Sequence, residues 1–88
     1  MLDQELYARI VTTAAKVLLV SPDDISPSTN LETDLGADSM DILEILFRLE
    51  RQFGVDIALP VWEAASVENL ARYLQEHVHQ TAPATSEF

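Results

Sequence analysis

The sequence has no cysteine and only a few glycines and prolines. Its 88 residues include two Gly and four Pro. Without cysteine, the chain can form neither a disulfide framework nor a thiolate metal site. Scarce Gly and Pro, together with 48% hydrophobic residues, favour a compact helical domain over a loop-rich or disordered chain. A chain of this length has room for one small domain.

Basic residues are also scarce, with 5 Lys and Arg against 15 Asp and Glu, which gives a formal net charge of −10. This charge repels phosphate backbones and anionic membrane surfaces, so we expect neither nucleic acid nor a membrane as partner. It attracts proteins with basic docking patches, and a transient protein partner fits it best. The sequence shows no secretory signal and no apolar run of membrane-spanning length. We therefore expect a cytoplasmic protein, and we expect it to be a monomer.

Apolar periodicity and capping signals predict four helices. The first covers residues 3–20, where apolar positions recur at spacings of three and four. The second covers residues 39–53, with Asp38 as N-cap and Gly54 as the residue that ends it. A short helix is expected in "PVWEAA" with Pro60 in its first turn, and Ser66 is expected to cap a last helix from residue 67 to about residue 78.

The apolar side chains of each predicted helix define the expected core. The first helix contributes Leu6, Ile10, Val11, Ala14, Val17 and Leu18; the second Leu43, Leu46, Phe47 and Phe53, flanked by Ile42, Ile45 and Leu49; the last Val67, Leu70, Ala71, Leu74 and Val78.

Three longer helices, one short helix and a long loop between the first two predict an all-α antiparallel bundle. We expect this domain to cover residues 1–79. Residues 80–88 show no periodicity and are expected to form a disordered tail. The initiating Met1 and the short tail favour a free-standing chain over an excised module.

The stretch "LGADSMD" places Ser39 at the start of the second helix. A first-turn Ser can be explained by helix capping alone. Asp38 already supplies that cap, and Asp41 at the third helical position can meet free amide groups and the positive helix end. The Ser39 hydroxyl is then left pointing outward, where a phosphate ester would lie against unpaired N–H groups. The small residues Gly36 and Ala37 would keep its approach open.

The longer segment "DLGADSMDILEIL" resembles the 4′-phosphopantetheine attachment motif of acyl carrier proteins, D-L-G-x-D-S-L-D, with Met40 in place of the usual Leu. The resemblance covers most of the chain, because the predicted helices and the long loop follow the family's order. It implies that a phosphopantetheinyl transferase, using coenzyme A and Mg²⁺, attaches the arm to Ser39, and that Asp38 assists this metal-dependent step. Apart from that step, no metal is expected.

The same resemblance implies a carrier and not an enzyme. The arm would supply the only thiol of the chain, so acyl intermediates would be tethered to it as thioesters. Acyl-loading enzymes, synthases and acyltransferases would receive these intermediates in turn and perform the chemistry.

Partner enzymes of this family dock on the polar face of the second helix. The positions that the resemblance assigns to docking are Met40, Asp41, Glu44, Arg48, Glu50 and Arg51. Arg48 and Arg51 depart from the more uniformly acidic helix of carriers in primary fatty-acid synthesis, and they would weaken docking to strongly basic patches. We therefore expect a specialised polyketide, modified-lipid or fatty-acid-related pathway, with aminoacyl carriage as the alternative. Glu44 and Arg48 can equally form an ordinary helical ion pair.

Trp62 has two interpretations. A lone Trp in a small domain usually packs in the core. The second interpretation follows from the family resemblance, because carriers of this family shelter acyl chains between the second and third helices. In this interpretation an acyl pocket is lined by Leu43, Leu46, Phe47 and Trp62. An indole there would favour a short or polar cargo, as in D-alanyl carrier proteins.

Other chemical signals are weak. A Ser-His-Asp catalytic site is disfavoured because the sequence has no G-x-S-x-G motif. A zinc site is disfavoured because His77 and His79 are two residues apart, which puts them on different faces of a helix. An EF-hand in "DLGADSMDILEI" has Ser39 where Gly is required and Ile45 where Glu is required. An acidic helical adaptor without a prosthetic group shares the charge and fold, and modification of Ser39 discriminates it from a carrier.

Overall fold

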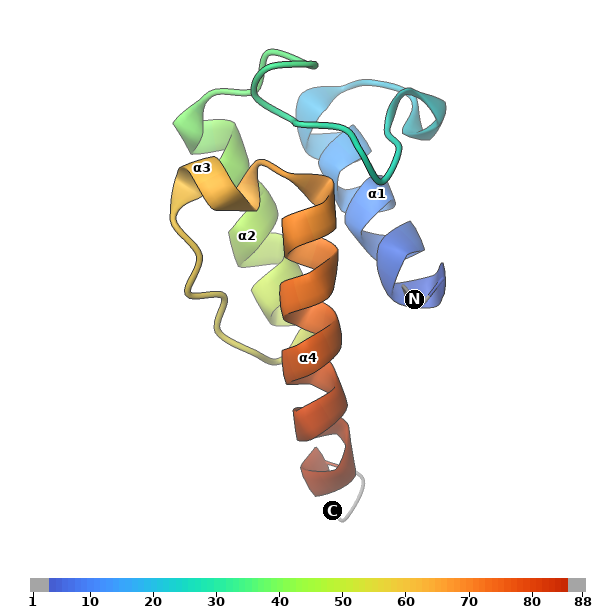
Figure 1. Ribbon diagram of the computed structural model, residues 1–88, viewed down its shortest axis with the longest axis vertical. Coiled ribbons are helices and arrows are strands. Elements are labelled where there is room, and N and C mark those ends of the chain that lie inside the picture. The colour runs from blue at the N-terminus through green and yellow to red at the C-terminus, as the bar shows by residue number, and fades with distance from the viewer. Residues whose placement is uncertain (1–3, 86–88) are drawn as a thin grey trace.

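The structure, a computed structural model, describes residues 4–85 and the side chains of residues 4–78. Its elements are α1 (Gln4–Leu18), the 3₁₀ turn η1 (Pro22–Asp24), α2 (Ser39–Phe53), α3 (Val61–Ala64) and α4 (Val67–Thr85). Helices α2 and α4 run opposite to α1, and the loop after α2 returns along the outside of the bundle to α3 (Figure 1). The predicted all-α bundle is confirmed.

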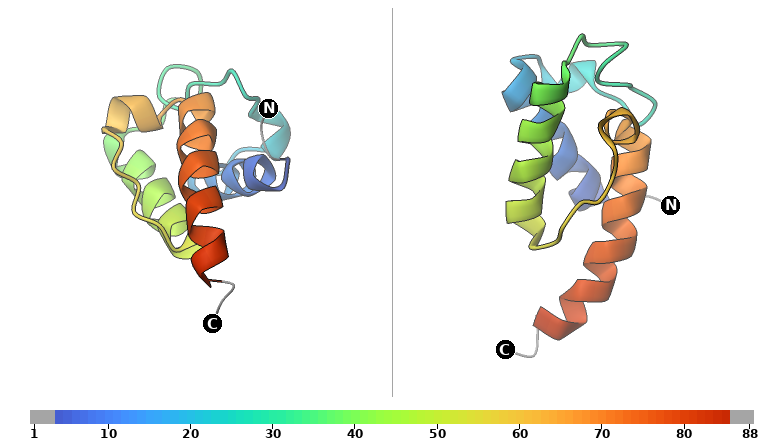
Figure 2. Two further views of the ribbon diagram at one scale, coloured as in Figure 1. Left: turned by 60° about the horizontal axis from the view of Figure 1, so that its bottom comes forward. Right: turned by 90° about the vertical axis from the view of Figure 1, so that its left-hand side faces the viewer.

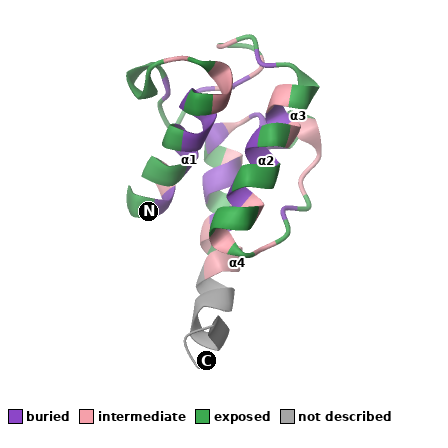
Figure 3. Ribbon diagram, turned by 180° about the vertical axis from the view of Figure 1, so that it is seen from behind, coloured by how far each residue is buried: buried purple, intermediate pink, exposed green. Residues whose placement is uncertain are grey.

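The core lies where α1, α2 and α4 face one another (Figures 2 and 3). Its largest fully buried side chains are Ile10, Leu31, Ile42, Ile45, Leu49, Val67, Leu70 and Leu74. Two contacts show how α1 packs against α2. The Gln52 side-chain amide donates to the Thr13 hydroxyl at 2.8 Å, and the Arg9 guanidinium lies 5.6 Å from the centre of the Phe53 ring. Thr13 follows Arg9 in α1, whereas its partner Gln52 precedes Phe53, the partner of Arg9, in α2. The two helices therefore pack antiparallel.

The long loop between α1 and α2 is fastened to the rest of the bundle. The Leu31 N–H donates to the Ala65 carbonyl at 2.7 Å, and the Val67 N–H donates to the Thr29 carbonyl at 3.1 Å. Leu31 is fully buried, so the loop has an apolar anchor as well as hydrogen bonds. Nearer α1, the half-buried Tyr7 hydroxyl donates to a loop carbonyl, and burial raises the pKa of the Tyr7 phenol. The start of α2 is thereby held at a fixed place on the bundle.

The helix ends differ from expectation at three places. Helix α1 stops at Leu18 and not at residue 20, because Leu19 adopts the left-handed region with φ of 58°. Pro60 precedes α3 as its N-cap instead of lying in its first turn. Helix α4 runs to Thr85, whereas the sequence placed its end near Val78. Helix propagation adds a hydrogen bond for each residue fixed, so a helix can continue beyond its packed face.

Part of the expected tail, residues 80–85, is therefore helical, and residues 86–88 lie outside the described residues. Residue 3, where the first helix was expected to begin, also lies outside them.

Two of the three large aromatic side chains expected in the interior are exposed, whereas Phe53 packs against the core. Phe47 is 58% exposed and Trp62 is 70% exposed, so the core-packing interpretation of Trp62 is wrong, as is the place given to Phe47 on the apolar face. The buried face of α2 consists of Ile42, Ile45, Leu46 and Leu49. These residues already cover the surface that faces α1 and α4. Phe47, one residue after Leu46, is turned about 100° away around a helix of 3.6 residues per turn.

Candidate functional site

The start of α2 is a capping box. The Asp38 carboxylate accepts a hydrogen bond from the Asp41 N–H at 2.8 Å, and the Asp41 carboxylate accepts one from the Asp38 N–H at 3.2 Å. Two donors that the helix leaves unpaired are thereby satisfied. The predicted N-cap at Asp38 is confirmed, and so is the first-turn position of Asp41.

Ser39 is the first residue of α2, and it is exposed. The capping box uses the N–H of Asp41, and no hydrogen bond to the N–H groups of Ser39 or Met40 is found within residues 4–85. Such amides at the positive end of a helix can donate hydrogen bonds to an anionic group. The Ser39 side chain therefore projects from a helix end that suits a phosphate ester.

The segment before Ser39 is ordered by short-range bonds. The Asp34 carboxylate accepts from the Asn30 N–H at 2.8 Å, and the Ala37 N–H donates to the Leu31 carbonyl at 2.9 Å. Gly36 has φ of +75°, in the left-handed region that other residues rarely adopt, and its missing side chain leaves open space. The turn at Gly36 thus leads the chain into α2, and no side chain projects from the turn at Gly36.

The polar surface of α2 carries the residues expected to dock partners. Met40 is 70% exposed, while Asp41 and Glu50 are half-buried and Glu44, Arg48 and Arg51 are exposed. Arg48 donates from Nε to Glu44 at 2.7 Å. The expected i,i+4 ion pair is therefore present, with both side chains about half exposed at 47% and 50%. An exposed pair of this kind contributes about 0.3–0.5 kcal/mol.

Glu50 has a structural contact that the sequence did not indicate. Its carboxylate accepts a hydrogen bond from the Ile57 N–H at 2.8 Å, and Ile57 is buried. This bond fastens the loop after α2 back onto the helix. Gly54 ends the helix in the left-handed region at φ of 68°, with its N–H bonded to the Glu50 carbonyl at 2.8 Å.

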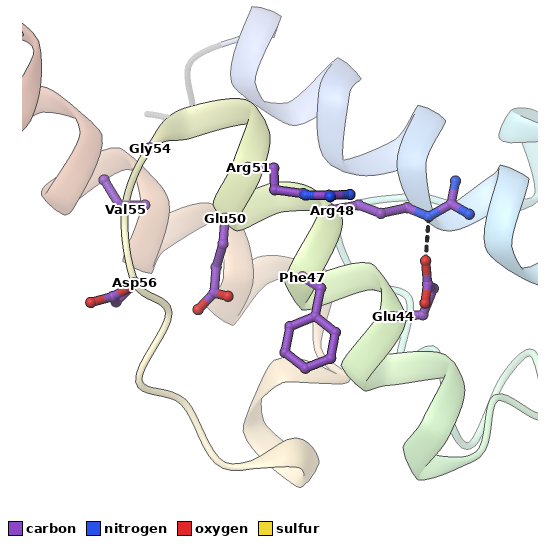
Figure 4. A pocket seen from close by; sticks show the side chains of 8 residues that line it. All are labelled: Glu44, Phe47, Arg48, Glu50, Arg51, Gly54, Val55 and Asp56. Carbon is purple, nitrogen blue, oxygen red and sulfur yellow. Dashed lines mark hydrogen bonds and ion pairs between the residues drawn. The ribbon is translucent and has the colours of Figure 1, made fainter.

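A groove of about 540 Å³ lies beside the second half of α2 (Figure 4). Its lining residues are Glu44, Phe47, Arg48, Glu50, Arg51, Gly54, Val55 and Asp56. Phe47 and Glu50 point toward the side of the loop that follows α2, and Arg48 extends across the helix to Glu44. Of the four residues expected to line an acyl pocket, only Phe47 lines this groove. Leu46 is buried in the core and Leu43 is half-buried.

A second groove, of about 360 Å³, lies between α1 and α2. Its lining residues are Glu5, Ala8, Arg9, Thr12, Thr13, Lys16, Arg48 and Gln52. Sequence reasoning missed this site. The signal was present in the spacing, because Arg9, Thr12, Thr13 and Lys16 recur at intervals of three and four and so share a helix face.

No group of three or more metal-binding side chains occurs in the described part of the chain. The His77 ring stacks on Tyr73 with 3.8 Å between centroids and bonds the Tyr73 carbonyl through Nδ1, and the His79 side chain lies outside the described residues. None of the described helices is long and apolar enough to cross a membrane.

Comparison with known proteins identifies the family. The family model described as "Phosphopantetheine attachment site" matches residues 8–74. An acyl carrier protein of Amoebophilus asiaticus is 32% identical over 71 residues, which cover 81% of this chain and 86% of that protein. An acyl carrier protein of Zymomonas mobilis is 36% identical over 70 residues, which cover 78% and 90%. The chain belongs to the acyl carrier proteins.

Members of this family are carriers and not enzymes, and they bear a covalently attached phosphopantetheine. They work with phosphopantetheinyl transferases and with enzymes that handle acyl groups. The described residues suit such an arm, because an exposed hydroxyl lies at the positive end of a capped helix.

Proposed function

We propose that Ser39 is the attachment residue for 4′-phosphopantetheine and that the protein presents acyl thioesters on this arm to biosynthetic enzymes. The observation that supports this proposal is the exposed Ser39 hydroxyl at the first position of α2, in the segment that resembles the attachment motif. The helix end offers N–H groups to the phosphodiester. The chain has no Cys, so the thiol of the arm is the group that can hold a thioester.

Asp38 has two roles in this proposal. Its Oδ1 atom accepts the Asp41 N–H and caps α2. The carboxylate keeps a second oxygen and its negative charge at the surface. We propose that this charge assists the Mg²⁺ ion that the transferase uses with coenzyme A, because carboxylate oxygens are suitable Mg²⁺ ligands.

Incubation of the apo protein with coenzyme A, Mg²⁺ and a promiscuous phosphopantetheinyl transferase tests the assignment. Intact mass spectrometry is expected to show the addition of one arm to the wild type and to Ser28→Ala, and none to Ser39→Ala. Ser28 is a matched control because it is an exposed loop serine whose hydroxyl forms a hydrogen bond with the Ser26 hydroxyl. An unmodified wild type would favour an adaptor without a prosthetic group, and a loaded Ser39→Ala would contradict the assignment of Ser39.

We further propose that Met40, Asp41, Glu44, Arg48 and Arg51 form the docking surface for partner enzymes. All five lie on α2 and are exposed or half-exposed. Glu50 also remains a proposed docking residue, although its carboxylate already bonds Ile57. The two arginines support a specialised polyketide, modified-lipid or fatty-acid-related pathway, because positive charges on this face disfavour strongly basic partners. Aminoacyl carriage is the alternative.

Three wider assignments complete the proposal. The domain covers residues 1–79, supported by the family match over residues 8–74 and by Val78, which packs against the core. The protein acts as a monomer, since a net charge of −10 opposes self-association. It works in the cytoplasm, where reducing conditions keep the thiol of the arm free.

A further inference from the structure

The basic residues of this acidic protein are unevenly placed. Of its five Lys and Arg residues, Arg9, Lys16 and Arg48 line the groove between α1 and α2, and Arg51 lines the neighbouring groove that shares Arg48. Only Arg72 lies elsewhere, on α4 in an ion pair with Glu68. The α1–α2 groove therefore has three cationic side chains and a single carboxylate, although the whole protein carries a net charge of −10.

Two of these cations are available to a ligand. Lys16 is exposed, and no ion pair or hydrogen bond of its side chain is found within residues 4–78. Arg9 is 48% exposed, pairs loosely with Glu5 at 3.7 Å and lies 5.6 Å from the centre of the Phe53 ring, contacts that still leave about half of its side chain accessible. Arg48 is engaged more closely, at 2.7 Å from Glu44. Binding of an anion in this groove would therefore depend mainly on Arg9 and Lys16.

Between its charged residues the groove is lined by small and polar side chains. Ala8 and Thr12 belong to it, and Thr13 is only 4% exposed, with its hydroxyl accepting the Gln52 amide at 2.8 Å. This bond joins the two helices under the groove. The distance along the axis between Arg9 and Lys16, seven residues apart, is about 10.5 Å at 1.5 Å per residue. The two helices that form the groove are thus joined by a hydrogen bond, and two of its cations are spaced along α1.

We propose that the α1–α2 groove binds an acidic segment of a partner protein, with Arg9 and Lys16 pairing with carboxylates of that segment. An isolated anion gains little from exposed cations, because solvent and salt screen each such pair. Several carboxylates on one peptide segment can pair with the cations of the groove at the same time. Long polyanions such as nucleic acids and anionic membranes extend beyond the groove into the field of the acidic surface, which acts over about 10 Å at ordinary salt. A short acidic segment avoids most of that repulsion.

This surface is separate from the arm proposed on Ser39. A partner that offers basic residues to Asp41 and an acidic segment to the α1–α2 groove would match both signs of charge, and such complementarity fixes the orientation of an encounter. Peptide binding in the groove does not need the arm. Ser39→Ala must therefore leave it unchanged, which distinguishes failure of this proposal from failure of the carrier assignment.

The test is titration of the full-length ¹⁵N-labelled protein with a short oligo-glutamate peptide at low salt, followed by NMR. Amide shifts are expected at Ala8, Thr12 and Gln52, and an oligo-glutamine peptide of equal length is expected to cause none. Combined Arg9→Gln and Lys16→Gln substitution is expected to raise the dissociation constant about fivefold, and Lys16→Gln alone about twofold. The single variant removes no hydrogen bond of the described structure and so is expected to fold normally.

Arg72→Gln is the matched control, since it removes a cation that also belongs to an exposed i,i+4 pair. It is expected to leave the dissociation constant within error of the wild type. Equal weakening by Arg72→Gln, shifts spread evenly over the surface, or equal shifts with inorganic phosphate at the same charge concentration would overturn the proposal. Absence of shifts in the groove would do so as well.

Discussion

Asp38 and Asp41 exchange two hydrogen bonds across the first turn of α2, at 2.8 Å and 3.2 Å, each carboxylate accepting the backbone N–H of the other residue. Ser39 lies between them. The same two residues therefore fix the helix start and surround the proposed attachment residue with negative charge.

The two roles of Asp38 can be separated by substitution. Asp38→Asn keeps a good N-cap but removes the charge, so its free energy of unfolding is expected to stay close to that of the wild type. Asp38→Ala is expected to lose about 0.5–2 kcal/mol, because the Asp41 N–H loses its acceptor. Both are expected to slow transfer of the arm to Ser39. Urea denaturation and loading followed by intact mass measure the two effects. If Asp38→Asn receives the arm at the wild-type rate, the role of Asp38 is limited to capping α2.

Glu50 is expected to matter for the loop after α2 whether or not partners contact it. Glu50→Ala removes the acceptor of the Ile57 N–H, and an unpaired amide at a buried residue costs about 1–3 kcal/mol. Glu50→Gln keeps an acceptor oxygen and is expected to lose less. Hydrogen exchange at the Ile57 amide reports the bond directly. If that amide exchanges in Glu50→Ala at the wild-type rate, the bond does not hold the loop.

Trp62 is expected to contribute little to stability, because it is 70% exposed. Trp62→Ala is expected to change the free energy of unfolding by no more than about 0.5 kcal/mol. Ile45→Ala in the fully buried core is expected to cost about 2–5 kcal/mol. A loss of that size in Trp62→Ala, measured by urea denaturation, would show that the indole packs inward in solution.

The acyl pocket that the family resemblance implies at Leu43, Leu46, Phe47 and Trp62 has its own test. If the cargo inserts between α2 and α3, loading with octanoyl or alanyl is expected to shift the NMR signals of Trp62, and a pocket that the indole narrows is expected to favour the shorter alanyl group. No shift with either cargo removes the pocket.

The arginines of α2 are expected to affect partner choice. Arg48→Glu with Arg51→Glu is expected to lower turnover with the cognate pathway enzymes severalfold, because docking charges mainly change the association rate. Arg72→Glu on α4 is the control, since it also breaks an exposed i,i+4 pair. Unchanged turnover in the α2 variant would leave Glu44 and Arg48 as an ordinary helix pair.

The sequence predicted α2 best because both ends of that helix carry explicit signals. Asp38 caps its start, and Gly54 supplies the left-handed residue at its end. The buried faces of α1 and α4 followed from apolar spacing, which placed Leu6, Ile10, Leu70 and Leu74 correctly. The segment "DLGADSMDILEIL" and the order of the predicted helices likewise indicated the family.

Other features depend on contacts that spacing does not encode. Phe47 and Trp62 are large and apolar, yet smaller residues fill the space between the helices and leave both rings outside. The Glu50–Ile57 bond depends on the path of a loop that has no regular pattern. The α1–α2 groove needs the register between two helices, which the contact of Gln52 with Thr13 supplies.

We propose above that Ser39 carries the arm. Fragmentation mass spectrometry of the intact protein purified from its own organism tests it most directly, because arm, acyl group and attachment residue are measured together. Phosphopantetheine, with or without an acyl group, is expected on the fragment that contains Ser39. Phosphopantetheine on another residue, or a protein that carries none in that organism, would contradict it.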